Sequence, residues 1–373
     1  MSKDTEAEID IHEVAPPPVE ADYVNPADKS PRWLLGAHAF FLRLGANIGF
    51  GLGNRTGQDV PPTPTRTIYI DSTLGKGKPE AQISASVWIP QSNGAPNNAK
   101  NRLAVINFHG GGFILGQATD DARWAAALMK GLDAVVFSVN YRLAPGYPFP
   151  TGVEDCVDSI IQIAKRAEEF GINPDRIILS GFSAGGNLAL SSWIVLQNPA
   201  QFGYTEMPSP LPRVAGFALY YPLLDWTLDR PQKRAACSRP DMTLPSGLTD
   251  LIDASYIHPS LPRRERTDIR LSPGLMPDDF IDQLPPVHLC LCEYDMLLAE
   301  GKLFAERMED RGKKISVRVV EAEKHAWDKP LPLGPKGTVS FEYEITIDAI
   351  KSWFDEYGAA DPGMDDIEEL SSN

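Results

Sequence analysis

The chain has 373 residues, of which 43% are hydrophobic and 23% are charged, and its formal net charge is −15 at pH 7. This composition is that of an ordinary globular protein and excludes a mostly disordered or membrane-embedded chain. The acidic balance excludes nucleic acid as an expected partner, because affinity for phosphate backbones depends largely on lysine and arginine.

Both ends of the chain are acidic and poor in apolar residues, which predicts flexible tails at residues 1–30 and 359–373. The first residues lack the apolar segment and cleavage site of a secretory signal, so a cytoplasmic location is expected. The cysteines at positions 156, 237, 290 and 292 show no metal-ligand spacing. They are expected to be reduced, buried thiols.

An apolar stretch at Trp33–Gly53 has about the length of a membrane span, but it carries His38, Arg43, Asn47 and five glycines. Such residues are unfavourable in a lipid-embedded helix, so stable membrane insertion is not expected. Region 31–60 is instead predicted to form an amphipathic helix that belongs to a cap. Contact of this helix with a membrane surface stays open as the alternative.

Strand-like and helix-like segments then alternate along the chain. Two short segments, Arg66–Ile70 and Gln82–Ile89, predict antiparallel edge strands. Continuous apolar runs predict strands buried on both faces of a parallel sheet, at Leu103–Phe108, Ala134–Val139, Arg176–Leu179, Val214–Tyr220 and Val287–Cys292. Further segments predict helices at Val153–Phe170, Gly186–Gln197, Leu297–Arg311 and Phe341–Tyr357, and a last strand at Ser316–Val320.

This order predicts an α/β fold over residues 61–358, with a mostly parallel eight-stranded sheet flanked by helices. The alternation stops between about residues 226 and 284, where only Leu248–Tyr256 reads as a helix. An insertion of that length is usually a lid or a binding loop. We assign it, together with the N-terminal helix, to the cap.

The segment Gly181-Phe182-Ser183-Ala184-Gly185 has the Gly-x-Ser-x-Gly pattern of a nucleophile elbow. A buried strand is predicted before it and a helix after it, which is the context this motif needs. The sharp turn strains the backbone at the serine, so small residues are required two positions away on each side. Ser183 is therefore the candidate nucleophile.

The segment His109-Gly110-Gly111-Gly112 directly follows a predicted buried strand, where a second donor to an oxyanion is expected. We predict that the backbone N–H groups of Gly111, Gly112 and Ala184 form an oxyanion hole. His109 and Gly110 are predicted to support this loop.

The base and the acid should follow the nucleophile in the order Ser, Asp, His. His325 is the histidine that lies after the last predicted strand, which makes it the candidate base. Asp295 lies just after the strand Val287–Cys292 and is the preferred acid. Glu293 and Asp328 are the weaker alternatives, and a helix N-cap is the other reading of Asp295.

These motifs resemble the hormone-sensitive-lipase-like branch of the α/β-hydrolases. The resemblance covers about residues 104–357 and extends to the landmarks Asn140-Tyr141-Arg142-Leu143-Ala144-Pro145 and Tyr221-Pro222-Leu223-Leu224-Asp225. It departs at Phe182 and at Gly146, where members of the family commonly carry an acidic residue. The loss at Phe182 is expected to change the hydrogen bonding behind the elbow and to make the pocket more apolar.

The resemblance implies a serine carboxylic-ester hydrolase that acts on short- to medium-chain acyl esters, with a small-molecule ester as its partner and with neither metal nor organic cofactor. An amidase, a formamidase or a lactonase would use the same residues. A non-catalytic module that binds a small ligand is the alternative from another class. The sequence leaves the oligomeric state undefined, and a homodimer is one option.

Overall fold

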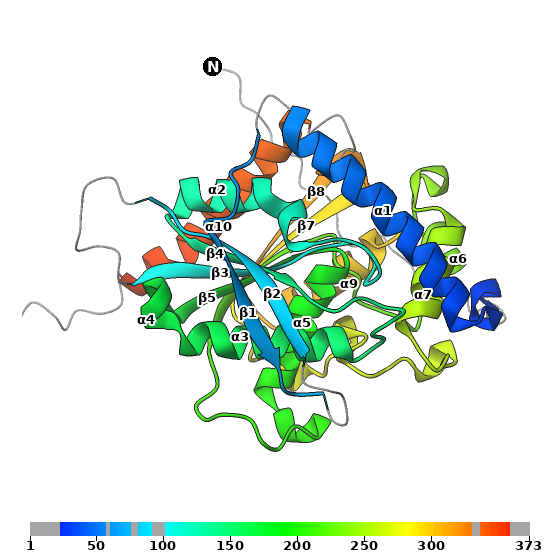
Figure 1. Ribbon diagram of the computed structural model, residues 1–373, viewed down its shortest axis with the longest axis horizontal. Coiled ribbons are helices and arrows are strands. Elements are labelled where there is room, and N and C mark those ends of the chain that lie inside the picture. Colours follow the sequence, from blue (N-terminus) through cyan, green and yellow to red (C-terminus); the bar gives the residue numbers. More distant parts are fainter. Residues whose placement is uncertain (1–22, 57–59, 76–80, 92–100, 330–335, 359–373) are drawn as a thin grey trace, which may run out of the picture.

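The computed structural model describes residues 23–56, 60–75, 81–91, 101–329 and 336–358. At its centre is an eight-stranded sheet with the strand order β1-β2-β4-β3-β5-β6-β7-β8, and helices cover both of its faces (Figure 1). The strands are β1 (Arg66–Ser72), β2 (Ala81–Trp88), β3 (Arg102–Phe108), β4 (Val135–Asn140), β5 (Ile172–Phe182), β6 (Val214–Tyr220), β7 (Val287–Tyr294) and β8 (Ile315–Lys324).

The strand pairing confirms the predicted, mostly parallel sheet. β1 pairs with β2 and β2 with β4 in antiparallel register, and all other neighbours are parallel. The prediction of two edge strands was wrong for β2, because β2 lies between β1 and β4. The side chains of Val87 and Trp88 at its end are fully buried, as expected for a strand covered by neighbours.

Two layers of helices bury the two faces of the sheet. One face packs on α3 (Thr151–Lys165), α5 (Ala184–Gln197) and α9 (Leu298–Asp310). The other packs on α2 (Ala122–Leu132) and α10 (Gly337–Gly358), which contact each other. The sequence analysis did not predict α2, and it joined α3 and the short helix α4 (Ala167–Phe170) into one.

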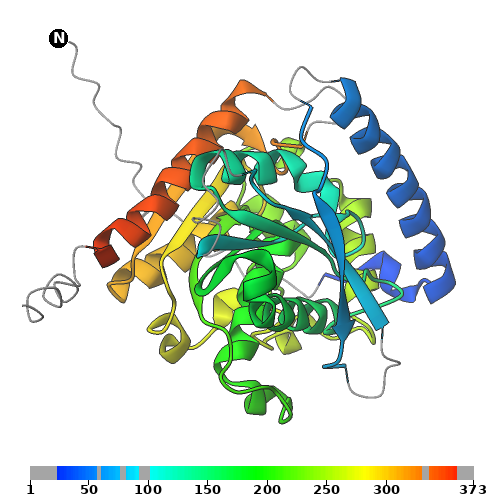
Figure 2. The same cartoon turned by 60° about the vertical axis from the view of Figure 1, so that its left-hand side comes forward.

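The sequence analysis assigned two segments to a cap, and we keep this name for them. Its helices are α1 (Arg32–Thr56), α6 (Arg230–Ala235), α7 (Ser246–Tyr256) and α8 (Asp278–Ile281), with the 3-10 turns η1 (Pro26–Lys29), η4 (Pro240–Met242), η5 (Arg263–Glu265) and η6 (Pro273–Leu275). Two further 3-10 turns, η2 (Ala118–Asp121) and η3 (Pro199–Phe202), lie in connections of the main domain. In Figure 1, α1, α6 and α7 gather on one side of the sheet, and Figure 2 shows α1 as the outermost element on its side.

Buried ion pairs hold the cap insertion together. The carboxylate of Asp253 on α7 is fully buried and accepts hydrogen bonds from Arg230, at 2.6 Å, and from Arg263, at 2.5 Å. These charges hold the pKa of Asp253 below its ordinary value although burial alone would raise it. Removing one partner of such a buried pair leaves an uncompensated buried charge, so substitution of any one of these three residues should be destabilising.

The start of the described chain differs from the predicted tail at residues 1–30. Residues 26–29 form η1, the Tyr23 hydroxyl donates to Asp250 at 3.1 Å, and the buried Asn25 amide donates to the Asp250 carbonyl at 2.9 Å. These contacts fix the segment on α7, so residues 23–29 are not part of a flexible tail. Residues 1–22 and the predicted tail at 359–373 lie outside the described residues.

Within the described part of the chain, no helix is long and apolar enough to cross a membrane.

Candidate active site

Ser183 stands at a sharp turn between β5 and α5. Its φ is +54°, a left-handed value that strains a residue with a side chain, and its N–H donates to the carbonyl of Tyr220 at 2.8 Å. A Cβ atom on Gly181 would lie 2.3 Å from Gly185, and one on Gly185 would lie 1.9 Å from the Phe108 carbonyl oxygen. The two glycines of the motif are therefore required by close backbone approach.

The structure brings Ser183, His325 and Asp295 together in one chain of contacts. His325 Nε2 lies 2.8 Å from Ser183 Oγ, and His325 Nδ1 lies 2.6 Å from Asp295 Oδ2. Each residue follows the carboxyl end of a strand: β5 for Ser183, β7 for Asp295 and β8 for His325. Because parallel strands end at the same edge of the sheet, residues separated by 142 and 30 positions in sequence meet there.

The two alternative acids lie elsewhere. Glu293 accepts a hydrogen bond from the backbone N–H of Ala322 at 2.6 Å, and Asp328 accepts hydrogen bonds from the hydroxyls of Tyr221 and Tyr343. Asp295 also accepts a hydrogen bond from the Leu297 N–H at 3.0 Å, next to the start of α9. Asp295 thus contacts His325 as predicted for the acid, and it is not the N-cap of α9, which is Leu297.

The loop after β3 lies against the elbow. Gly111 and Gly112 have φ values of +112° and +61°, and a Cβ atom on Gly112 would lie 2.4 Å from the Ile252 side chain. Both glycines and Ala184 line the same cavity as Ser183. The His109 ring is buried and stacks on Tyr141 at 4.3 Å between ring centres. Burial lowers the pKa of His109, so its place in the structure suits support of the loop.

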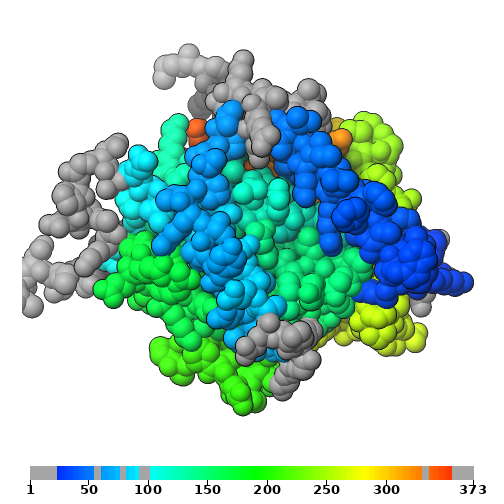
Figure 3. Space-filling view, viewed as in Figure 1, coloured from blue at the N-terminus to red at the C-terminus, as the bar shows by residue number. Residues whose placement is uncertain are grey.

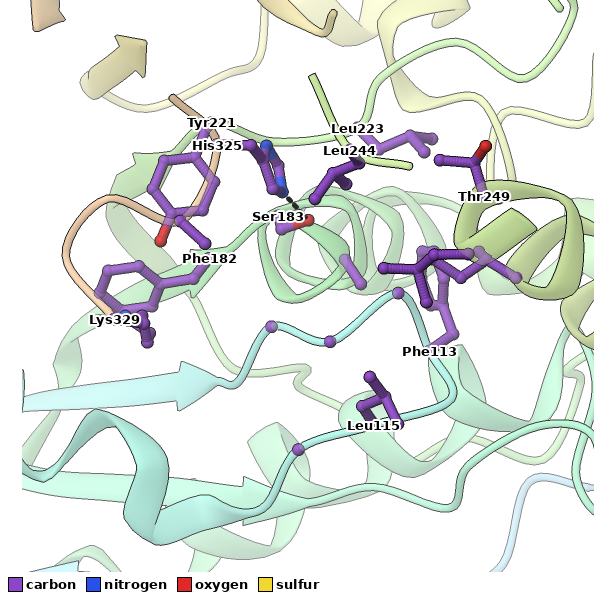
Figure 4. A pocket seen from close by; sticks show the side chains of 18 of the residues that line it. Phe113, Leu115, Phe182, Ser183, Tyr221, Leu223, Leu244, Thr249, His325 and Lys329 are labelled. Carbon is purple, nitrogen blue, oxygen red and sulfur yellow. Dashed lines mark hydrogen bonds between the residues drawn. The ribbon is translucent and has the colours of Figure 1, made fainter. Parts of the chain in front are cut away.

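Ser183 and His325 open into a cavity of about 340 Å³. Figure 4 shows two sides of this cavity, with Ser183 between them. Leu223, Leu244 and Thr249 lie on the side of the cap, while Phe182 and Lys329 lie on the other side (Figure 4). The cap side is mostly apolar, with Thr249 and Arg230 as its polar residues, and α1 adds to the wall through Ala46 and Phe50.

The other side of the cavity places a charged group against Phe182. The ammonium nitrogen of Lys329 lies 3.5 Å from the centre of the Phe182 ring, a cation–π contact, and 3.1 Å from a carboxylate oxygen of Asp121. Lys329 also pairs with Asp328. The expectation that Phe182 makes the pocket more apolar stays a prediction, because it compares this chain with one that has an acidic residue at this position.

The sequence analysis missed the contact that supports His325 from the side. The Tyr221 ring meets the His325 ring edge to face at 4.7 Å, and the Tyr221 hydroxyl donates to Asp328. The motif Tyr221-Pro222-Leu223-Leu224-Asp225 marked this segment as a landmark, but nothing in it showed which side chain would touch the histidine.

Asp120 at the cavity wall gives a prediction for the pH dependence of stability. Burial, and then the charge of Asp121, raise the pKa of the Asp120 carboxyl to about 7. The native state therefore keeps this proton to higher pH than the unfolded chain, whose carboxyl titrates near pH 4. The stabilisation is complete below about pH 4 and is lost as the pH rises to about 7.

The variant Asp120→Asn tests this prediction, because an amide at this position cannot titrate. We subtract the free energy of unfolding of Asp120→Asn from that of wild type, both measured by urea denaturation. We expect this difference to decrease as the pH rises from about 4 to about 7. A difference independent of pH would contradict the shift.

The comparisons with known proteins show the family of the chain. Residues 105–329 match the family described as alpha/beta hydrolase fold. An arylesterase of Saccharolobus solfataricus is 31% identical over 220 residues, 58% of this chain and 66% of that protein. Arylacetamide deacetylase of Bos taurus is 27% identical over 319 residues, 72% of this chain and 76% of that protein. EstE1, a thermostable carboxylesterase cloned from a metagenomic library, has a solved structure with a TM-score of 0.65 and 27% identity, covering 84% of this chain and 97% of that one.

The sheet, its helical layers and the elbow between β5 and α5 define an α/β-hydrolase fold. The chain belongs to the hormone-sensitive-lipase-like branch of this family, and it is a hydrolase that acts on ester bonds.

Proposed function

We propose that the chain is a serine carboxylic-ester hydrolase that uses Ser183, His325 and Asp295 and acts on short- to medium-chain acyl esters. The observation that carries this proposal is the pair of contacts of 2.8 Å and 2.6 Å that join the three side chains at the wall of an apolar cavity. Nucleophile and base lie within hydrogen-bond reach, and a third group orients the base, as this chemistry requires.

In the proposed reaction, His325 Nε2 removes the proton of Ser183 Oγ as the oxygen attacks the ester carbonyl carbon. Asp295 accepts the hydrogen bond of His325 Nδ1–H and holds the imidazole in the productive tautomer. The tetrahedral intermediate then collapses, the C–O bond to the alcohol breaks, and His325 gives its proton to the leaving oxygen. Water repeats the sequence on the acyl-enzyme, which releases the acid and restores Ser183.

The proposed oxyanion hole consists of the N–H groups of Gly111, Gly112 and Ala184. Its support is the position of all three at the cavity wall beside Ser183, together with the left-handed backbone of the two glycines. The N-terminus of α5 also points its positive end at the turn, which favours negative charge there. One such donor contributes on the order of 10²–10³ in kcat in a protease of the same chemistry.

The dimensions of the cavity support the proposed acyl length. Its volume of about 340 Å³ lies at the lower end of the range of about 300–1,000 Å³ for ligand pockets. Leu244, Leu248 and Ile252 of the cap bound the apolar side. A short or medium acyl chain fits such a space, whereas a long chain would need an open end.

The test is a series of p-nitrophenyl esters from acetate to palmitate. We expect the highest kcat/KM at short or medium chain length, because the cap closes the apolar side of the cavity. Turnover that depends on Ser183 but is fastest on palmitate would contradict the proposed acyl-chain length and would still agree with the proposed esterase. No turnover on any chain length, with folded protein, would contradict the proposed esterase.

A second candidate is the cleavage of an aryl amide, and the similarity to arylacetamide deacetylase favours it over the formamidase and lactonase alternatives. The same residues would serve, but the amide nitrogen leaves only after protonation by His325. Parallel assays of p-nitrophenyl acetate and p-nitroacetanilide distinguish the two. A kcat/KM for the anilide equal to or above that for the ester would make the amide the proposed substrate.

A further inference from the structure

Helix α1 carries a wide apolar face that points away from the protein. Seven large side chains on it are between 41% and 73% exposed: Trp33, Phe40, Phe41, Leu42, Leu44, Ile48 and Leu52. Most of them follow the spacing of three or four residues that places side chains on one side of a helix. Figure 3 shows the helix lying along the surface, with this part of it open to solvent.

The inner face of α1 is firmly attached. Leu35 and Ala39 are buried, and Ala46 and Phe50 line the catalytic cavity. The guanidinium group of Arg43 donates to the backbone carbonyls of Ile114, at 2.7 Å, and of Ala144, at 2.6 Å. Because these contacts fix the rotation of the helix, its outward face is a defined surface of the fold.

The outward face is also uncharged. Arg43 is the only formally charged residue between positions 33 and 53, and its guanidinium is bound on the inner side. His38 and Asn47 are the residues of this stretch with other polar side chains. This face therefore has no charged side chain that could form an ion pair with a charged partner.

The area of this face is large for a monomer, but the face has few groups with which to form the polar contacts of a dimer. At about 200 Å² for a fully exposed aromatic side chain and somewhat less for leucine and isoleucine, the seven residues expose roughly 750 Å². This is above the largest apolar patch on typical monomers, about 300–600 Å². A stable dimer buries about 800 Å² on each partner. It also forms about ten hydrogen bonds, for which two polar side chains on this face are too few.

We propose that the outward face of α1 binds the surface of an uncharged or zwitterionic lipid layer, with its aromatic and aliphatic side chains among the acyl chains. Such binding needs apolar area and no directional partner. It places the helix in the plane of the lipid surface, and the same helix forms a wall of the catalytic cavity. Apolar esters dissolved in the lipid then reach the cavity without crossing bulk water. The formal charge of −15 repels an anionic surface, which restricts the partner to neutral lipid.

The test is cosedimentation of the full chain with phosphatidylcholine vesicles. We expect wild type to pellet with the vesicles and Ile48→Glu to bind about tenfold more weakly, because a carboxylate would have to enter the apolar layer. The matched control is Leu303→Glu on α9, since Leu303 has the same exposed fraction of 57% and also lies on a helix. The control should bind as wild type does.

Three results would overturn the proposal. Wild type could stay in the supernatant at all vesicle concentrations, or it could bind only when phosphatidylserine is added, which would invert the charge argument. It could also be a dimer by light scattering that Ile48→Glu separates, which would assign the face to a second copy of the chain. Hydrolysis of p-nitrophenyl acetate in lipid-free buffer should be equal in wild type and Ile48→Glu, so failure of lipid binding leaves the test of the proposed esterase independent.

Discussion

Ser183→Ala is expected to lower kcat for ester hydrolysis by about 10⁶-fold, the loss seen when the serine of a comparable triad is removed. The variant keeps His325, the glycine loop and the cavity, but it has no oxygen that can form the acyl-enzyme. KM should change little, because the small methyl group of alanine occupies part of the space of the serine side chain. The measurement is kcat and KM for a short p-nitrophenyl ester.

Two controls make the result specific to the chemistry. The urea midpoint of Ser183→Ala should be close to that of wild type, because alanine has the same backbone strain at a φ of +54° and, among the described interactions, the Ser183 side chain bonds only to His325. A fluorophosphonate probe should label wild type and fail to label the variant. Retained turnover or retained labelling in a folded variant would show that another residue is the nucleophile.

The nucleophile and the glycine loop could be predicted because local sequence determines them. Gly185 lies so close to the Phe108 carbonyl that no side chain fits at its position. The constraint of the turn is therefore visible in five adjacent residues of the sequence. The same holds for Gly111 and Gly112, whose positive φ values favour glycine. The five central strands of the parallel part were predicted for a related reason, since strands buried on both faces must be continuously apolar.

The positions of Asp295 and His325 could be predicted only from the order of the strands and helices along the chain. Neither residue has a motif of its own, but each follows a strand that ends at the active-site edge of the sheet. The prediction depended on recognising β7, which is a clear apolar run, and β8, a less apolar segment that carries Arg318. It did not depend on distances, which the sequence does not contain.

The surroundings of the site could not be predicted, because they depend on contacts between distant segments. Lys329 lies over the ring of Phe182 at a sequence separation of more than a hundred residues, and nothing near either residue in sequence requires the other. The helix α2 was missed for a similar reason. Its buried residues Trp124 and Leu128 meet α10 across one face of the sheet, so tertiary packing stabilises a segment whose own sequence includes a glycine at position 131.

Asp295→Asn is expected to lower kcat by about 10⁴-fold, as in the corresponding protease variant. The asparagine side chain can donate to His325 Nδ1, and this favours the tautomer in which Nε2 carries the proton and cannot accept one from Ser183. KM should stay close to that of wild type, because Asp295 is buried and does not line the cavity. A steady-state assay that separates kcat from KM therefore distinguishes loss of the base from damage to the pocket.

Glu293→Gln provides the matched control for this variant, since the two carboxylates lie two positions apart at the end of β7 and both accept a backbone hydrogen bond. Glu293 bonds the N–H of Ala322 and has no contact with His325 among the described interactions, so its amide should reduce stability slightly and leave kcat within about threefold of wild type. Equal losses of kcat in the two variants would mean that both substitutions act by disturbing the structure at the end of β7. A larger loss in Glu293→Gln would assign the acid to Glu293. Only a loss confined to Asp295→Asn, with KM unchanged, agrees with a carboxylate that holds His325 in its productive tautomer.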